Sequence, residues 1–238
     1  MKKYLFFIFI LGAVVAASGC IGSGGTGSGN VINETTKVSG FNQVALDGIG
    51  TLIITQGNTE SLTIEAEDNI IPYIKTTIKD NMLKISYDVS TPTPIKPVKF
   101  HLTVKNISSI DISGAGKLSA DNLSTDSLNL FVNGAAEGNL ANIQLKSLVL
   151  TISGAGKINA SGNTATQTIN MNGAGEFNAP SLISQSTTIT INGAGKATLN
   201  ANKTLNAIIN GAGQVNYFGN PQITQKINGL GKINHLVH

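Results

Sequence analysis

Few side chains in the second half of the sequence are suited to acid–base chemistry, and they are dispersed. Its acidic residues are Asp111, Asp121, Asp126, Glu137 and Glu176. Cleavage of a glycan needs two carboxyl groups that flank one bond, or acidic calcium ligands together with a base. Asp121 and Asp126 are close enough in sequence to share a turn. They predict either a weak cation site or, as the simpler interpretation, two solvated turn side chains.

The histidines and the single cysteine do not form a metal-binding pattern. His101 stands alone, His235 and His238 lie at the C-terminal end, and Cys20 is the only cysteine. A zinc site draws its nitrogen and sulfur ligands from short, characteristic spacings, which these residues lack. The sequence therefore predicts no catalytic residue, no cofactor and no metal, and a protein that is not an enzyme.

Cys20 is instead positioned for lipid attachment. Lys2 and Lys3 precede an uncharged apolar run over residues 4–17, and small residues then lead into Cys20. This pattern resembles a lipobox, so we predict a signal peptide over residues 1–19 and a lipid on Cys20. The alternatives are an ordinary signal peptide with an incidental cysteine and an uncleaved anchor helix. Residues 20–30 are rich in glycine and serine, and they predict a flexible tether to a membrane of the cell envelope.

The basic residues argue against a nucleic-acid partner. All 16 are lysines, and the sequence has no arginine and no tryptophan. Nucleic-acid recognition depends on arginine forks and on stacking against aromatic rings. Without Lys2 and Lys3 the formal charge is 14 minus 13, or +1, so the mature surface is close to neutral.

A repeated motif predicts the elements that carry these side chains. The pattern Ser/Asn-Gly-Ala-Gly occurs seven times with small variations, spaced 18–20 residues apart, and each copy follows alternating aliphatic residues. A repeat this short cannot bury a core by itself, whereas stacked copies can. We therefore predict an all-β fold, a single-stranded parallel β-helix (β-solenoid) with coils of 18–20 residues over residues 109–238. The copies begin at Ser113, Asn133, Ser153, Asn172, Asn192, Asn210 and Asn228.

Stacking in register would bring the residue four positions after each motif start into one row. No two neighbours in this row carry like charges, and successive members would lie about 5 Å apart. Asparagines at the motif starts would form a second row of stacked amides. We therefore interpret both rows as structural. The charged row consists of Lys117, Glu137, Lys157, Glu176, Lys196, Gln214 and Lys232.

Residues 31–108 lack the motif but remain rich in predicted strands. We interpret them as irregular first coils that also cap the N-terminal end of a β-helix domain spanning 31–238. Three prolines between residues 88 and 98 predict an excursion over the surface. The candidate binding residues are the aromatic and proline side chains of this region, Tyr73, Tyr87, Pro92, Pro94 and Pro97.

The chain ends five residues after Ile233. No evident cap covers the last sheet edges, and such edges invite pairing with another chain. We therefore expect Ile227, Ile233, Leu236 and Val237 to form a surface for a partner or for homo-oligomerisation.

The Gly-Ala-Gly repeats resemble the head GIN domain family of auto-transporter adhesins. The segments 41–48 and 215–221 share this resemblance, which covers about residues 38–234. It implies a right-handed parallel β-helix on a secreted or lipid-anchored envelope protein, and it supplies no catalytic residue. We expect a lipid-anchored, extracytoplasmic adhesin or envelope-organising protein with a polysaccharide or protein partner. The alternative is a secreted β-helix protein that binds or cleaves polysaccharide.

Overall fold

The computed structural model describes residues 25–237. It is built of strands, with one short 3-10 helix, η1 (Ile71–Tyr73). The strands that precede the repeats are β1 (Val31–Thr36), β2 (Gln43–Gly48), β3 (Thr51–Gln56), β4 (Ser61–Glu67), β5 (Ile74–Lys79), β6 (Met82–Tyr87) and β7 (Lys99–Val104). The repeats form β8 (Ser109–Gly114), β9 (Lys117–Asp121), β10 (Ser124–Gly134), β11 (Glu137–Gly154), β12 (Lys157–Gly173), β13 (Glu176–Gly193), β14 (Lys196–Gly211), β15 (Gln214–Phe218), β16 (Gln222–Gly229) and β17 (Lys232–His235).

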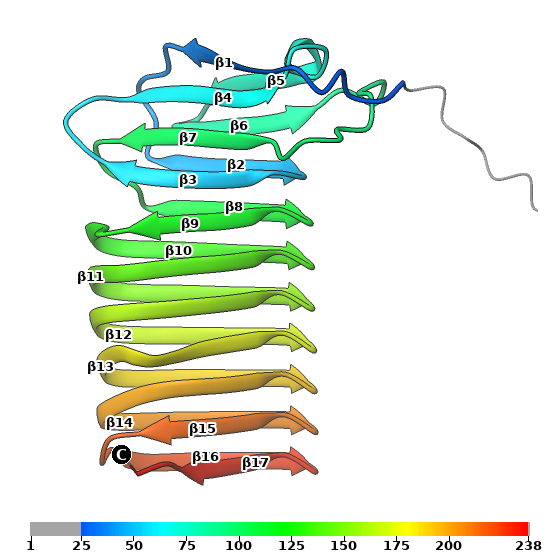
Figure 1. Cartoon of the computed structure of the whole chain (residues 1–238). Helices are drawn as coiled ribbons and strands as arrows, with labels where there is room; N and C mark the ends of the chain where they lie inside the picture. Colours follow the sequence, from blue (N-terminus) through cyan, green and yellow to red (C-terminus); the bar gives the residue numbers. More distant parts are fainter. Residues whose placement is uncertain (1–24, 238) are drawn as a thin grey trace, which may run out of the picture.

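Parallel pairing between successive repeats produces a β-solenoid (Figure 1). β10 pairs with β8 on one side and with β11 on the other, and the stack continues through β12, β13 and β14 to β16. The register keeps the motif copies on top of one another, so that Gly134 is aligned with both Gly114 and Gly154. The predicted β-solenoid with coils of 18–20 residues is therefore confirmed.

The long strands bend, and each full coil has three stretches that face inward. In β11 the alternation of buried and exposed residues runs over 138–140, 143–145 and 148–152, and it changes phase between these stretches. Asn142 forms one of the corners with a φ of 54°, a left-handed conformation that asparagine tolerates. The bends let a single long strand close around the core.

Glycine is required at the corner that each motif forms. Gly154 has a φ of 124°, and a Cβ atom there would lie 2.5 Å from the carbonyl oxygen of Gly134. That carbonyl accepts a hydrogen bond of 2.9 Å from the N–H of Ala155. Adjacent coils can pair this closely only because the corner has no side chain.

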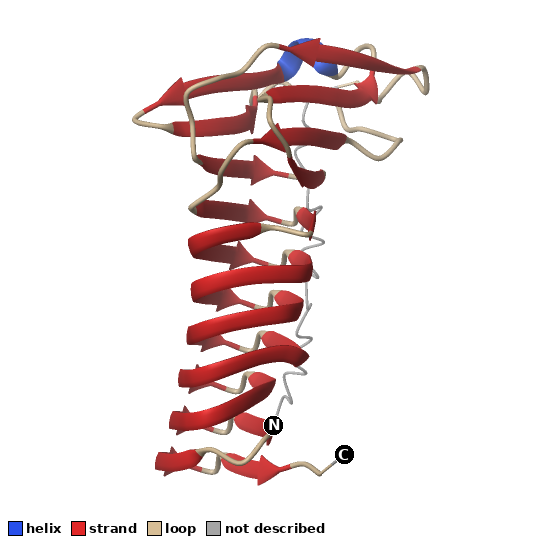
Figure 2. Ribbon diagram, turned by 90° about the vertical axis from the view of Figure 1, so that its left-hand side faces the viewer, coloured by secondary structure: helices blue, strands red, loops and turns tan. Residues whose placement is uncertain are grey.

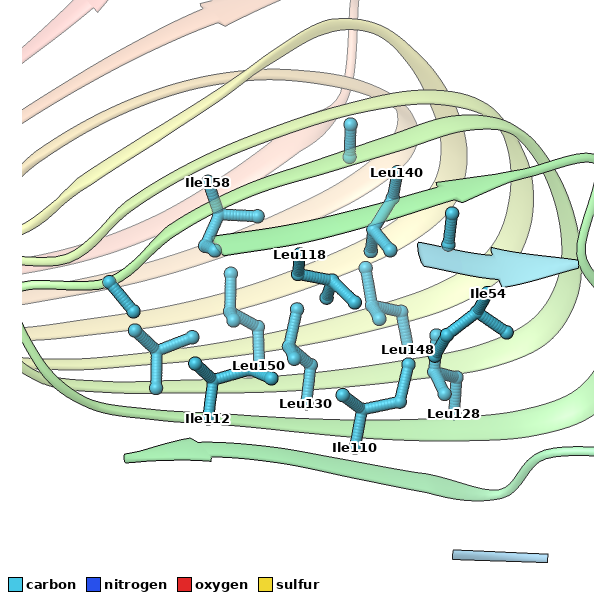
Figure 3. Close-up of a cluster of buried hydrophobic side chains, with 14 of the residues drawn as sticks. Ile54, Ile110, Ile112, Leu118, Leu128, Leu130, Leu140, Leu148, Leu150 and Ile158 are labelled. Atoms are coloured by element: carbon cyan, nitrogen blue, oxygen red, sulfur yellow. The ribbon is translucent and has the colours of Figure 1, made fainter. Parts of the chain in front are cut away.

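Aliphatic side chains fill the interior of the coils in aligned rows (Figure 3). Leu128 is aligned with Leu148 and Leu130 with Leu150, and none of the four is more than 1% exposed. Figure 3 shows these side chains pointing toward Leu118, Leu140 and Ile158, which come from the opposite wall. Stacking of identical side chain types thus gives these neighbouring coils a common core.

One row of the core becomes polar in the middle of the rod. Gln167 follows Leu148 in this row and is 1% exposed. Its Nε2 donates hydrogen bonds to Ser184 Oγ at 3.0 Å and to Thr187 Oγ1 at 2.9 Å. Its Oε1 is buried and has no hydrogen-bond partner in the structure. An unpaired buried acceptor is costly, so this position is a local weakness of the core.

The N-terminal region combines one regular coil with a mixed sheet (Figures 1 and 2). β2 and β3 stack in parallel on β8 and β9, with Gly48 aligned with Gly114. β6 and β7 pair in parallel with β2 and β3. β4, β5 and β1 then add antiparallel pairs, and Figure 2 shows these strands lying across the end of the stack.

These antiparallel pairs differ from the irregular coils that the sequence suggested for residues 31–108. β5 and β6 form a hairpin because Asp80 and Asn81 both have positive φ, 51° and 62°, as a tight two-residue turn requires. β4 pairs with β7, so that Ser61 is aligned with Thr103. The antiparallel strands cover the first end of the rod.

Candidate binding surface at the N-terminal end

The loop between β6 and β7, residues 88–98, is fixed at its start by Asp88. The Asp88 side chain accepts hydrogen bonds from the N–H and the hydroxyl of Ser90, and its carbonyl accepts one from the N–H of Thr91. Lys75 Nζ lies 2.5 Å from Asp88 Oδ2. The hydrogen bond from Lys75, together with those from Ser90, lowers the pKa of Asp88 to about 2. The loop therefore starts from an ionised, multiply bonded carboxylate.

The far part of the loop is held by Glu67, the last residue of β4. Its side chain is fully buried and accepts hydrogen bonds from three backbone N–H groups: Gly29 at 2.7 Å, Ile95 at 2.9 Å and Lys96 at 3.2 Å. Burial raises the pKa of Glu67, but the three N–H donors and the charge of Lys96 outweigh it, so the pKa lies below its ordinary value. Three donors to one carboxylate make a strong, charge-assisted site. Glu67 thereby joins the loop to the N-terminal segment.

The N-terminal segment, residues 25–30, packs against the same loop. Thr93 donates its N–H to the carbonyl of Gly25 and accepts the N–H of Gly27, both at 2.9 Å. Asp68 accepts hydrogen bonds from Ser28 Oγ and Asn30 Nδ2. The last six residues of the tether predicted for 20–30 are thus fixed to the domain. The predicted signal peptide, 1–19, and Cys20 lie outside the described residues.

A groove runs along the base of the loop, which we call the Ile49 groove. It consists of two adjoining cavities of about 300 and 180 Å³ that share Ile49 and Pro94. The larger cavity is also lined by Gly48, Tyr87, Thr91, Pro92 and Thr93. The smaller one is lined by Gly50, Thr51, Lys96, Pro97, Val98, Ala115 and Lys117. The lining combines apolar, hydroxyl and lysine side chains and contains no carboxylate.

Four of the five predicted binding residues line this groove. These are Tyr87, Pro92, Pro94 and Pro97, whereas Tyr73 belongs to η1 and lines neither cavity. Pro92 is buried and Pro97 is exposed. Sequence reasoning missed Ile49, which is 44% exposed although it is apolar. A signal was available, because Ile49 lies between Gly48 and Gly50, where the motif has alanine.

Tyr87 supports the groove more than it offers a free ring. Its hydroxyl donates a hydrogen bond of 2.9 Å to the carbonyl of Ile49, and its ring packs edge-on against Phe100 with 6.4 Å between centroids. Burial raises the pKa of the Tyr87 hydroxyl. The ring therefore forms a rigid part of the groove wall.

Two further apolar side chains protrude from the loop. Val89 is fully exposed and Ile95 is 58% exposed. Neither residue lines the Ile49 groove. Sequence reasoning passed over them because it examined the aromatic and proline residues of this segment. We call Val89 and Ile95 the loop tip.

The charged row lies along the side of the rod. Lys117 pairs with Glu137 and Lys157 with Glu176, each with 3.2 Å between nitrogen and oxygen. The strand register places Lys196, Gln214 and Lys232 in the same row. The asparagines of the motif starts form an amide ladder, in which Asn228 donates to Asn210 and Asn210 to Asn192, both at 2.7 Å. These contacts link successive coils.

The C-terminal end of the rod is open. Every residue of β16 is exposed, including Ile227 at 39%. Val237 is also exposed, whereas Ile233 packs partly against the core. Leu236 is half-buried, and its N–H donates a hydrogen bond to the carbonyl of Tyr217. The inward row of the last coil contains His235, whose ring stacks on Tyr217 with 4.8 Å between centroids.

The acidic turn residues have separate partners. Asp121 accepts a hydrogen bond from Asn142, and Asp126 forms an ion pair of 2.8 Å with Lys146. Among residues 25–237, no three histidine, cysteine or acidic side chains come together as metal ligands would. Within the same residues no helix has the length and apolar character needed to cross a membrane.

Comparison with known proteins identifies the family. A crystal structure of "a putative adhesin" from Bacteroides fragilis is similar over 90% of this chain and 100% of its own, with a TM-score of 0.84 and 26% identity. A "putative lipid binding protein" from Parabacteroides distasonis has a TM-score of 0.70 at 20% identity, covering 89% of this chain and 99% of its own. A "putative adhesin" from Parabacteroides merdae gives 0.68 at 20% identity, covering 89% and 98%. These last two show the shared fold.

No curated protein matches the chain. Residues 40–221, more than half of the sequence, match the family model described as "Putative auto-transporter adhesin, head GIN domain". This confirms the resemblance found in the repeats. The chain therefore belongs to the head GIN domain family.

Proposed function

We propose that the protein is a lipid-anchored, non-catalytic adhesin of the cell envelope, which stands outside the membrane. Membership of the adhesin family supports an extracytoplasmic location. The lipobox-like sequence before Cys20 supports the anchor. The observation that carries the proposal is the docking of residues 25–30 on the first end of the rod, through Thr93 and Glu67. A chain anchored at Cys20 thus holds the rod by its N-terminal end.

The coil stack then acts as a stiff spacer. Its glycine corners run in register from Gly48 to Gly229, which are seven steps of about 4.8 Å, or about 34 Å in total. Backbone pairing on both sides of each inner coil, with the charged row and the amide ladder, resists bending. The uncovered C-terminal end lies farthest from the anchor.

We place partner binding in the Ile49 groove. Its hydroxyl groups and the lysines Lys96 and Lys117 suit a polar, oxygen-rich ligand such as an envelope polysaccharide, and the Tyr87 ring adds an apolar wall. The groove lining has no carboxylate pair to protonate and attack a glycosidic bond. Binding without cleavage is therefore the activity that the groove favours.

The anchor is tested by fractionating cells that express the full chain or its Cys20→Ser variant. We expect the unaltered chain to incorporate labelled fatty acid and to partition with membranes, and the variant to do neither. An unaltered chain that is released without label would refute the anchor.

Binding is tested with a chain that starts at residue 21, which retains the docked segment. It is presented to a panel of envelope and surface polysaccharides, and both retention and chain cleavage are followed. Lys96→Ala should weaken retention, whereas Lys203→Ala, an exposed lysine on β14, should not. Cleavage would overturn the non-catalytic assignment, and equal retention of both variants would move the site away from the groove.

A further inference from the structure

The loop tip is an ordered apolar projection. Val89 follows Asp88, whose side chain has bonds to Ser90 and Lys75, and the N–H of Ile95 is bound by buried Glu67. The backbone is thus fixed on both sides, while the two side chains point into solvent. Exposed aliphatic side chains on a well-held loop gain free energy when they are removed from water. Ile95 lies beside the N-terminal segment, because Glu67 binds both Ile95 and Gly29, and Val89 belongs to the same loop.

The loop tip lies close to the predicted anchor point. The N–H of Thr93 bonds to the carbonyl of Gly25, and Thr93 is two residues from Ile95. Cys20 precedes Gly25 by five residues, and a fully extended chain of that length spans at most about 18 Å. A lipid on Cys20 would therefore keep Gly25, and with it the bonded Thr93 of the 88–98 loop, near the bilayer surface.

We propose that Val89 and Ile95 insert past the head groups into the upper acyl chains of the bilayer that holds Cys20. This inference rests on the proposed lipid anchor. The lipid supplies attachment, and the loop tip supplies a second contact that fixes how the rod stands. Insertion of a few apolar side chains to the level of the head groups and upper acyl chains is the ordinary mode of interfacial binding. Lys96, next to Ile95, is exposed and suits the phosphate groups of lipids.

A bilayer fits this surface better than a protein does. A stable protein interface buries about 800 Å² on each partner, far more than two aliphatic side chains offer. A membrane surface needs no complementary shape. Glu67 completes the arrangement, because it binds Gly29 of the N-terminal segment and Ile95 of the loop tip with one carboxylate. The segment leading to the anchor and the inserting side chain are thus fixed to each other.

The absence of tryptophan from the chain allows a direct test. Full-length protein carrying Val89→Trp or Ile95→Trp is purified with its lipid and reconstituted in phosphatidylcholine vesicles with brominated acyl chains. Bromine quenches only indoles that reach the acyl region. Ile183→Trp, an exposed aliphatic position on the side of the rod, is the matched control. Circular dichroism verifies that each variant is folded, and flotation verifies that it is bound to vesicles.

We expect loss of indole fluorescence for Val89→Trp and Ile95→Trp and none for Ile183→Trp. Vesicle-bound protein without quenching at either tip position would overturn the insertion while leaving the anchor in place. Equal quenching at all three positions would mean that the rod lies flat, which also overturns it. Protein that carries no lipid and does not float with vesicles would refute the anchor, and the inference with it.

Discussion

Replacing one corner glycine tests how closely the coils are packed. In Gly154→Ala, the new Cβ would lie 2.5 Å from the carbonyl oxygen of Gly134, a contact that backbone must relieve by moving. The φ of 124° is itself a conformation that alanine rarely adopts. The substitution therefore combines conformational strain with the separation of two coils.

The size of the effect follows from these two contributions. A non-glycine residue in this region of φ costs about 1–3 kcal/mol. Separating the coils weakens two hydrogen bonds across the corner, from Ala155 to Gly134 and from Lys157 to Ala136, worth about 0.5–1.5 kcal/mol each. We therefore expect Gly154→Ala to lower the free energy of unfolding by about 2–6 kcal/mol.

Gly40→Ala is the matched control. Gly40 also has a positive φ, 79°, but a Cβ there would meet no atom within 4 Å. It should cost only the backbone term, about 1–2 kcal/mol. Urea unfolding followed by circular dichroism measures both variants, and amide hydrogen exchange locates the damage at the coils flanking Gly154. Equal destabilisation by the two substitutions would refute the close contact between corners.

Three further predictions concern the core, the charged row and the C-terminal end. Gln167→Leu removes a buried acceptor that has no partner, and Ser184 and Thr187 still bond to each other at 2.7 Å. Thermal unfolding should therefore show a gain in the free energy of unfolding of about 1 kcal/mol. A lower free energy of unfolding would show that the amide is needed. Glu176→Lys places three lysines next to one another in adjacent coils, and it should lower the free energy of unfolding by about 1 kcal/mol. Added salt should reduce this loss, because salt screens the repulsion between the lysines. A loss that does not depend on salt would contradict charge repulsion as its cause. The uncovered last coil predicts that the protein associates as its concentration rises, and that Ile227→Asp weakens this association. Sedimentation measures both. A strict monomer at high concentration would exclude association through this end.

Acidification should release the N-terminal contacts before it affects the coils. The pKa of Asp88 is lowered to about 2, and those of Glu67 and Asp68 are lowered as well. A lowered folded-state pKa gives stability that is present above the unfolded value, near 4, and is lost as the pH falls through the folded value. Amide exchange of Thr93 and Ile95 should therefore accelerate between about pH 4 and pH 2 while the amides of β11–β13 stay protected. Simultaneous loss of protection everywhere would contradict the local role of these carboxylates.

The repeated half could be predicted in detail because parallel stacking preserves sequence position. Equivalent residues of successive copies, such as Lys117 and Glu137, are neighbours in space, so the spacing of the motif gives the register directly. In the N-terminal half, no repeat spacing indicates which strands pair. The turn at Asp80 and Asn81 carries a local signal, but the pairing of β4 with β7 joins residues about forty positions apart, which no local pattern encodes.

The candidate site was predictable only in part for the same reason. The composition of the proline-rich segment indicated a surface loop, and four of the five candidate residues line the Ile49 groove. Glu67 looks like any glutamate at the end of a strand, and its three N–H donors come from two distant segments. Tertiary packing, which the sequence pattern does not express, makes this carboxylate the point that holds the 88–98 loop to the N-terminal segment.

The two ends of the rod differ in how far other strands cover their edge strands. A stack of parallel strands leaves unpaired backbone groups at both ends, which invite uncontrolled association. At the N-terminal end, β4, β5 and β1 cover the stack, and Glu67 fixes the segment leading to Cys20 against this cover. At the C-terminal end of the described residues, β16 and β17 remain uncovered, and the rows that continue the core contain Ile227 and Ile233 together with the polar His235. In a rod held at its closed end, association through β16 would join rods at a distance from the bilayer, whereas a ligand in the Ile49 groove would be bound near it.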